Sequence, residues 1–460
     1  MLPSLALRAL FVPTLIGICY NDGVAAEARA TSIHRRAMSR PLRHLPVLQN
    51  WDCHGTGTCC KGEYQVTITD EEKKRIEVQG WDPDRDLGGR APVRRVGWLW
   101  GRRWVLNHKP DGSCVFLSEQ GRCRIHEKHG YKTKPLPCRL FPFVLVPLYD
   151  RWAVGLRYAC PSAAANKGRP LTGHDPELRE FALELAQREG LKPQPDGALT
   201  PPPRLQGWQR IEWPDLLRIL DTLLAILQNR KASVERRLRQ CLTFAAEMRK
   251  VRLDDIKGAK LGELLQILQG AAEGETPADN WSLPRPGWVG RVLFRQAAAL
   301  FTRKDHGPNC GLAARGRLAL MGAAWRFVRG KGLVPQMHRA IPEASFAQLE
   351  EPAGPPPADV EDILERYYVI KVGSMQFCPP SFGLSFWEGL ESLLVTYPVL
   401  MWVARMYRDR SRADAVVQAL TIVDDHVGFN RVLRGMRQRL SFRILASTGQ
   451  LARLIAWYSR

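Results

Sequence analysis

The sequence predicts an α+β protein in which a small, irregular, cysteine-rich metal-binding module precedes a mainly α-helical region. Seven of the eleven cysteines fall between Cys53 and Cys160, among short apolar runs and turn-forming residues. From Asp175 onward, apolar residues recur at helical spacing behind capping residues and prolines. The composition, 45% hydrophobic and 25% charged, is that of a globular protein, and 460 residues can bury more than one core.

The cysteine-rich part is expected to contain short strands and single helical turns. Thr69, with Glu72 three residues later, forms a capping box that opens a helix to about Gln79. The segment 81–90 is rich in turn-forming residues. Alternation and turn signals predict the remaining elements: strands at 64–68, 93–100 and 103–106, a helical turn at 123–128, and a hairpin at 144–148 and 152–158.

The second part is expected to be helical throughout. Its helices are predicted at 176–190, 215–228, 234–250, 261–269, 288–302, 312–328, 360–372, 386–406, 413–427 and 431–458. Loops rich in Pro and Gly separate groups of helices near 192–207, 275–286 and 350–358. We therefore expect three parts: 1–37, a cysteine module at 38–165, and one or more helical domains at 175–460.

The first 37 residues loosely imitate a signal peptide, because the apolar run 2–20 is followed by small residues. Arg8, however, lies inside that run rather than before it. Met38 stands just ahead of the first cysteine motif, so we expect translation to begin there and the protein to be cytoplasmic. An odd number of clustered cysteines also suits metal ligands better than disulfide pairs. Because Arg8 interrupts the run 2–20, no uninterrupted segment approaches the roughly 18 apolar residues that a transmembrane helix needs.

The formal net charge of +21 is the unusual feature of the composition. Such a charge is typical of proteins that meet nucleic acid, an anionic membrane, an acidic protein or an anionic cofactor. The basic residues are mostly arginines spread along predicted helices, and no base-reading motif accompanies them. We therefore expect solvated helix faces and a protein partner rather than nucleic acid.

The clustered cysteines are candidate metal ligands. Thiolates bind zinc in closed sets of four and hold iron–sulfur clusters in similar numbers. A buried cysteine can also pack as a small hydrophobe, but seven of them beside His, Arg, Gly and Pro favour a metal or cluster site. More thiols are present than one site needs, so the identity of the ligands stays open among Cys53, Cys59, Cys60, Cys114, Cys123, Cys138 and Cys160, with His126 as a further candidate.

The order of these motifs resembles the CxxCxxCC family of zinc- or iron-chelating domains, which includes the flagellin lysine N-methylases. The resemblance covers about residues 50–162 and rests on five motifs: Cys53 to Cys60, Cys114-x-Phe-Leu, Cys123-x-Ile-His-Glu, Cys138-Arg-x-Phe-Pro-Phe and Cys160. Thr56 stands where the family has its second cysteine, so the first motif offers three thiols. A weaker similarity to the lysine N-methylases covers segments 234–248, 364–380 and 424–426.

This resemblance implies S-adenosylmethionine as methyl donor, a protein lysine as acceptor, and an iron–sulfur cluster or zinc in the cysteine module. The residues themselves supply no Gly-rich donor site of the Rossmann type. The acids and phenols that could assist a lysine acceptor are Glu127, Tyr158, Glu365, Tyr367 and Tyr368, and the sequence singles out none. The alternative function is a non-enzymatic, zinc-stabilised interaction or scaffold protein.

Two further groups have a structural and a functional interpretation. Trp98, Trp100 and Trp104 on the predicted hairpin could stack bases, but such a set more often covers a small core, which is what we expect. Glu361 and Glu365, with the adjoining Arg366, are expected to be exposed helix charges.

Overall fold

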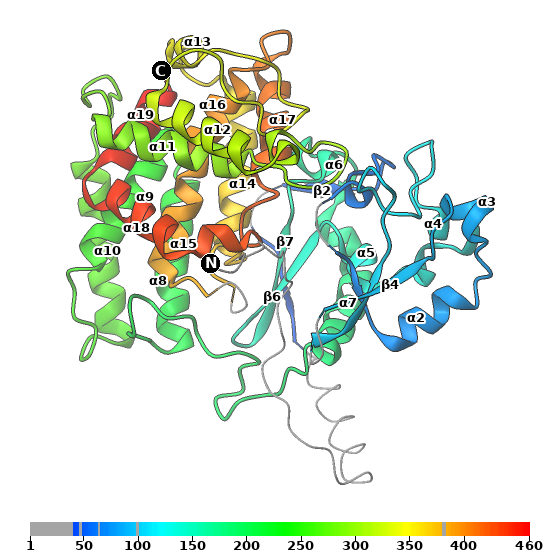
Figure 1. Ribbon diagram of the computed structural model, residues 1–460. Helices are drawn as coiled ribbons and strands as arrows, with labels where there is room; N and C mark the ends of the chain where they lie inside the picture. Colours follow the sequence, from blue (N-terminus) through cyan, green and yellow to red (C-terminus); the bar gives the residue numbers. More distant parts are fainter. Residues whose placement is uncertain (1–39, 46–47, 63–64, 98–100, 380–382) are drawn as a thin grey trace, which may run out of the picture.

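The computed structural model describes residues 40–460, except 46–47, 63–64, 98–100 and 380–382. Segment 1–37 therefore lies outside the described residues. Small sheets and short helices form one side of the molecule and a bundle of longer helices forms the other, with strands β6 and β7 between them (Figure 1). This arrangement confirms the α+β class and its order along the chain. In the described part, no helix is both long and apolar enough to cross a membrane.

Three small sheets organise the N-terminal half. A parallel contact joins β1 to β7, which pairs antiparallel with β6, with Leu145 opposite Val154. The antiparallel hairpin β4–β5 is extended by β3, and β2 pairs with β8. The strands are β1 (Leu42–Arg43), β2 (Asn50–Trp51), β3 (Thr67–Ile68), β4 (Val93–Val96), β5 (Arg103–Leu106), β6 (Phe143–Leu148), β7 (Arg151–Leu156) and β8 (Arg169–Pro170).

Short helices connect these strands. The predicted capping box is present, because Thr69 accepts a hydrogen bond from the Glu72 amide and the Glu72 side chain accepts one from the Thr69 amide. The segment 81–90, expected to be turns alone, also holds a short helix that Asp82 caps. The α-helices of this half are α2 (Asp70–Glu77), α3 (Pro83–Leu87), α4 (Arg124–His129), α5 (Leu136–Leu140), α6 (Pro161–Ala164) and α7 (Asp175–Arg188).

Some helices of the helical region begin at a capping side chain. Ser233 accepts a hydrogen bond from the Arg236 amide at the start of its helix, as its position predicts. The α-helices are α8 (Trp213–Gln228), α9 (Val234–Met248), α10 (Gly258–Glu275), α11 (Trp288–Phe301), α12 (Arg317–Arg329), α13 (Phe346–Glu350), α14 (Ala358–Gly373), α15 (Phe386–Leu394), α16 (Thr396–Ala404), α17 (Arg412–Val423), α18 (Met436–Ser447) and α19 (Gln450–Tyr458).

Three predicted helices are interrupted in the structure. Pro398 has no amide to donate to the carbonyl four residues earlier, and the predicted helix 386–406 divides into α15 and α16. Gly449 adopts φ 67° and separates α18 from α19, while Gly316 adopts φ 91° just before α12. In each case local backbone chemistry ends a helix that apolar periodicity alone would continue.

Two hydrophobic cores result. The larger extends from the β6–β7 hairpin through the whole helical region and includes Trp152, Leu223 and Trp402. The smaller lies under α2 and the β3–β5–β4 sheet, and joins Ile76, Phe116 and their neighbours to the buried Cys114. The cysteine cluster adjoins this smaller core.

Candidate metal centre

Five of the seven candidate cysteines line one small hollow beside the smaller core. Its cavity volume is about 20 Å³. The cysteines come from four separate places: the 3-10 turn Thr58–Cys60, a bridge opposite His108, the residue before α4, and helix α5. In sequence order they are Cys59, Cys60, Cys114, Cys123 and Cys138.

Backbone contacts bring these segments together. The Cys114 amide donates to the Cys60 carbonyl at 2.8 Å, which fixes the second segment on the first. Gly57 adopts φ 69°, and a Cβ atom there would lie 2.7 Å from the Gly121 carbonyl oxygen. Only glycine therefore lets the Thr58–Cys60 turn pack against the loop that precedes Cys123.

One pair of sulfur atoms lies near the spacing of a tetrahedral thiolate site. The sulfurs of Cys59 and Cys60 are 4.0 Å apart, and the Cys60 thiol also interacts with the thiols of Cys114 and Cys123. Four sulfurs around a zinc ion, with bonds of about 2.3 Å, would be about 3.8 Å apart. Among the described His, Cys, Asp and Glu side chains, no three already form a closed ligand set. Metal binding would thus require the thiols to turn toward a common point.

The thiols differ in acidity. The hydrogen bond from Cys60 lowers the pKa of Cys59 to about 7 and that of Cys123 to about 6, although burial opposes both shifts. Hydrogen bonds to Cys114, Cys123 and Cys59 raise the pKa of Cys60, and burial raises the pKa of Cys138. The hollow therefore favours two thiolates near neutral pH and holds further thiols that a cation would deprotonate.

Lys134 also lines the hollow, and the sequence interpretation missed it. Burial disfavours its charge, but the neighbouring thiols, Cys123 and Cys138 first, raise its pKa overall. Its carbonyl accepts a hydrogen bond from Arg139 Nε at 3.0 Å, which ties the lysine to the start of α5. The sequence signal was its position four residues before Cys138, across two prolines.

The other candidate ligands lie elsewhere. Cys53 is exposed, and Cys160 is buried at the start of α6 in the larger core. His126 is exposed, with its ring 5.6 Å from that of Tyr131. His108 also contributes to the lining of the hollow.

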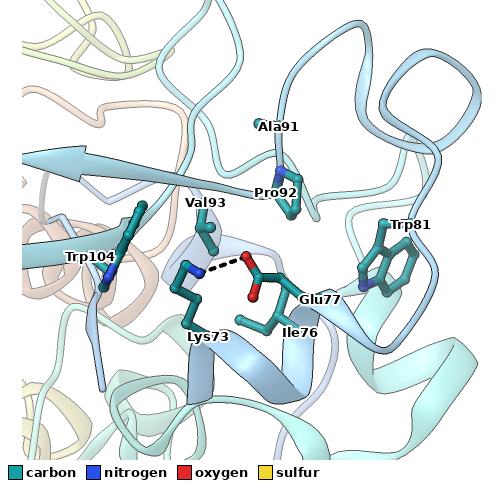
Figure 2. A pocket seen from close by; sticks show the side chains of 8 residues that line it. All are labelled: Lys73, Ile76, Glu77, Trp81, Ala91, Pro92, Val93 and Trp104. Atoms are coloured by element: carbon teal, nitrogen blue, oxygen red, sulfur yellow. Dashed lines mark ion pairs between the residues drawn. The ribbon is translucent and has the colours of Figure 1, made fainter. Parts of the chain in front are cut away.

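A second, larger hollow of the same module lies between α2 and the β4–β5 hairpin (Figure 2). It has a volume of about 360 Å³, with Trp81 and Trp104 at opposite ends and an ion pair between Lys73 and Glu77 at 2.8 Å. Lys73 Nζ also lies 4.6 Å from the centroid of the Trp104 ring. Trp104 packs at the edge of the smaller core, as expected, while Trp98 and Trp100 lie outside the described residues.

The candidate acid and phenol side chains do not line either hollow. Tyr158, Tyr367 and Tyr368 are fully buried. The expectation of an exposed charge is wrong for Glu365, which is buried and pairs with Arg237 at 2.8 Å. The reason is that α14 packs against both α8 and α9, so its polar positions face another helix. Glu127 lies at the surface, where it pairs with Arg122 at 2.7 Å.

A buried polar network joins the two halves of the chain. Lys371 Nζ lies 2.6 Å from Asp424 Oδ1, and both side chains are completely buried. The other carboxylate oxygen of Asp424 accepts from the Tyr158 amide at 2.6 Å, two residues before Cys160. Next to it, Asp425 pairs with Arg157 at 2.9 Å. The segment that leads into the last candidate cysteine is thus held by the end of α17.

Comparison with known proteins assigns the cysteine-rich part. Residues 52–162 match the family model CxxCxxCC, described as "Putative zinc- or iron-chelating domain". No curated protein and no solved structure matches the chain. The matched segment contains all five thiols of the hollow. Residues 52–162 are therefore similar to a domain family that is described as zinc- or iron-chelating.

Proposed function

We propose that the protein binds a single zinc or iron(II) ion in the cysteine hollow. This ion stabilises the cysteine-rich module, which serves as part of an interaction scaffold. The observation that carries this proposal is the convergence of five thiols on a cavity of about 20 Å³. Such a cavity accommodates about one water-sized body. One ion fits that space, whereas a cluster of several iron and sulfide atoms would need the walls to move apart.

The ligands we assign are Cys59, Cys60, Cys114 and Cys123, because the Cys60 thiol interacts with the thiols of the other three. Cys138 lines the same hollow as a fifth thiol. Four thiolates around a divalent cation leave an excess of negative charge, which the neighbouring Lys134 would offset. A closed thiolate set of this kind is structural rather than catalytic. The proposal also places the protein in the cytoplasm, where thiols remain reduced.

Metal analysis and an optical spectrum of anaerobically purified protein test this assignment. We expect one zinc or iron per chain without acid-labile sulfide, lost in Cys60→Ser and retained in Cys241→Ser. Cys241 is a matched control because it is a buried thiol of α9 in the larger core. A brown protein with stoichiometric sulfide would replace the single ion with an iron–sulfur cluster. A metal-free wild type would overturn the proposal.

A second candidate function is methyl transfer to a protein lysine, with S-adenosylmethionine as donor. Its support is the resemblance of three distant segments to lysine N-methylases, together with their contacts. Arg237 of the first pairs with Glu365 of the second, and Tyr367 of the second donates to Asp424 of the third at 3.2 Å. Calorimetry with S-adenosylmethionine tests it, and the absence of binding to the metal-loaded protein would remove this candidate.

A further inference from the structure

Helix α12 exposes a stripe of large apolar side chains. Leu318 is 83% exposed, Met321 68% and Trp325 62%. Their spacing of three and four residues puts them on one face of the helix. These are strongly exposed positions for a leucine, a methionine and a tryptophan on a regular helix.

The opposite face of α12 is also apolar, because Ala323 and Phe327 are buried. Helix α12 packs along α11 through that inner face and lies on the outside of the helical region (Figure 1). A helix that is apolar on both sides is normally buried on both sides. The outer stripe therefore indicates a second apolar environment that covers α12.

Within the segment 306–342, which Asp305 and Glu343 bound, the charge has one sign. Residues 306–342 contain six arginines and lysines and no aspartate or glutamate. Five of these basic residues flank the stripe along α12 and its two ends, and all five are exposed: Arg315, Arg317, Arg326, Arg329 and Lys331. Within the described part of the chain, none of the five forms an ion pair. A surface that covers α12 would therefore be complementary to these side chains if it carried negative charge.

We propose that α12 docks this protein on an anionic membrane surface, with the helix parallel to the bilayer plane. Leu318, Met321 and Trp325 would enter the interface between head groups and acyl chains. The flanking arginines would meet anionic head groups at the same depth, which is the arrangement of interfacial amphipathic helices. This proposal goes beyond metal binding and does not depend on it.

Charge complementarity and shape favour a lipid surface over a second copy of the chain or an acidic protein as the partner of α12. A second copy of the chain would bring two sets of unpaired arginines together, with no acid in either segment to relieve the repulsion. The stripe is one helix wide and lies on the outside of the helical region. Only side chains in such an outer position can enter a bilayer. An anionic lipid surface offers an apolar interior and negatively charged head groups along the whole length of such a helix.

Vesicle sedimentation of the full-length protein tests the proposal. The probes are phosphatidylcholine vesicles with and without phosphatidylglycerol. The test variant, L318Q/M321Q/W325Q, removes the stripe and leaves every charge in place. Its matched control, V78Q/W208Q/I267Q, removes three exposed apolar side chains from other surfaces, where Val78 is 83%, Trp208 87% and Ile267 67% exposed.

We expect the wild type and the control to bind the anionic vesicles and the test variant to bind about tenfold more weakly or worse. A second variant, R317Q/R329Q, changes only exposed side chains and should weaken binding roughly fivefold for each charge removed. If the wild-type protein does not bind anionic vesicles, the proposal is wrong, and the stripe would instead bind an acidic protein partner. Equal binding by the wild type and the test variant would also overturn it, as would a dimeric wild type that L318Q/M321Q/W325Q makes monomeric.

Discussion

The two hydrophobic cores of this protein differ in the interactions that stabilise them. The larger core has enough apolar area to bury a lysine and an aspartate completely and pair them at 2.6 Å. The smaller core joins a few apolar residues of α2, β5 and their connections, and five thiols face a hollow at its edge. Where apolar area is scarce, cross-links or a bound metal can supply the missing free energy. Where it is abundant, buried polar groups are tolerated when they are paired.

The cores are nevertheless physically connected. The β6–β7 hairpin belongs to the cysteine-rich half of the sequence, yet Trp152 and Leu156 pack in the larger core. Asp424 of the helical half also accepts a hydrogen bond from the Tyr158 amide. The two cores therefore differ in composition, but they are not separate in space.

The largest effect should follow the loss of metal from the cysteine hollow. Structural zinc sites contribute apparent binding free energies on the order of 10 kcal/mol, so Cys60→Ser or a strong chelator should open the smaller core. Limited proteolysis should then cleave first between residues 58 and 138. Cys241→Ser should leave the digestion pattern unchanged. Faster cleavage of the helical region instead would contradict the idea that the metal supports only the smaller core.

The next largest effect should come from the buried ion pair of the larger core. Lys371→Met leaves the Asp424 carboxylate without its cation and should lower the free energy of unfolding by about 3–5 kcal/mol. Urea denaturation measures this change. The double variant K371M/D424N should recover part of the loss, because no unpaired charge remains. Additive losses in the double variant would show that the pair itself contributes little.

A pH dependence should arise in the larger core at Glu391, which pairs with Arg249 at 2.7 Å. Burial raises the pKa of Glu391 to about 7, above its ordinary value of 4.5, so the folded protein binds this proton more tightly than the unfolded chain. The stabilising contribution is complete below about pH 4.5 and disappears as the pH rises through about 7, a change on the order of 3 kcal/mol. Glu391→Gln should flatten the stability profile in that window, as urea denaturation at several pH values would reveal. An unchanged slope would contradict the assignment.

The smallest effects should come from matched helix caps in the two halves. Thr69→Ala removes the capping box of α2, and Ser233→Ala removes the cap of α9. Each should cost about 1 kcal/mol, but hydrogen exchange should report the first loss in the smaller core only. Equal changes throughout the chain would mean that the two cores unfold as one cooperative unit.

The sequence by itself determined the features that depend on neighbouring residues. The capping box at Thr69, the cap at Ser233 and the β6–β7 hairpin follow from local hydrogen bonds and alternation. The density of cysteines predicted a metal site because few other structures require so many thiols in one stretch. The similarity of residues 52–162 to a zinc- or iron-chelating domain family supports that prediction.

Only the tertiary structure decided which thiols meet. The contact between the Cys114 amide and the Cys60 carbonyl, and the placement of Lys134 among the thiols, join segments that no local pattern relates. The burial of Glu365 depends in the same way on Arg237 of a distant helix. Spacing along a chain fixes which face a side chain occupies, but the partner that faces it depends on the packing of the entire fold.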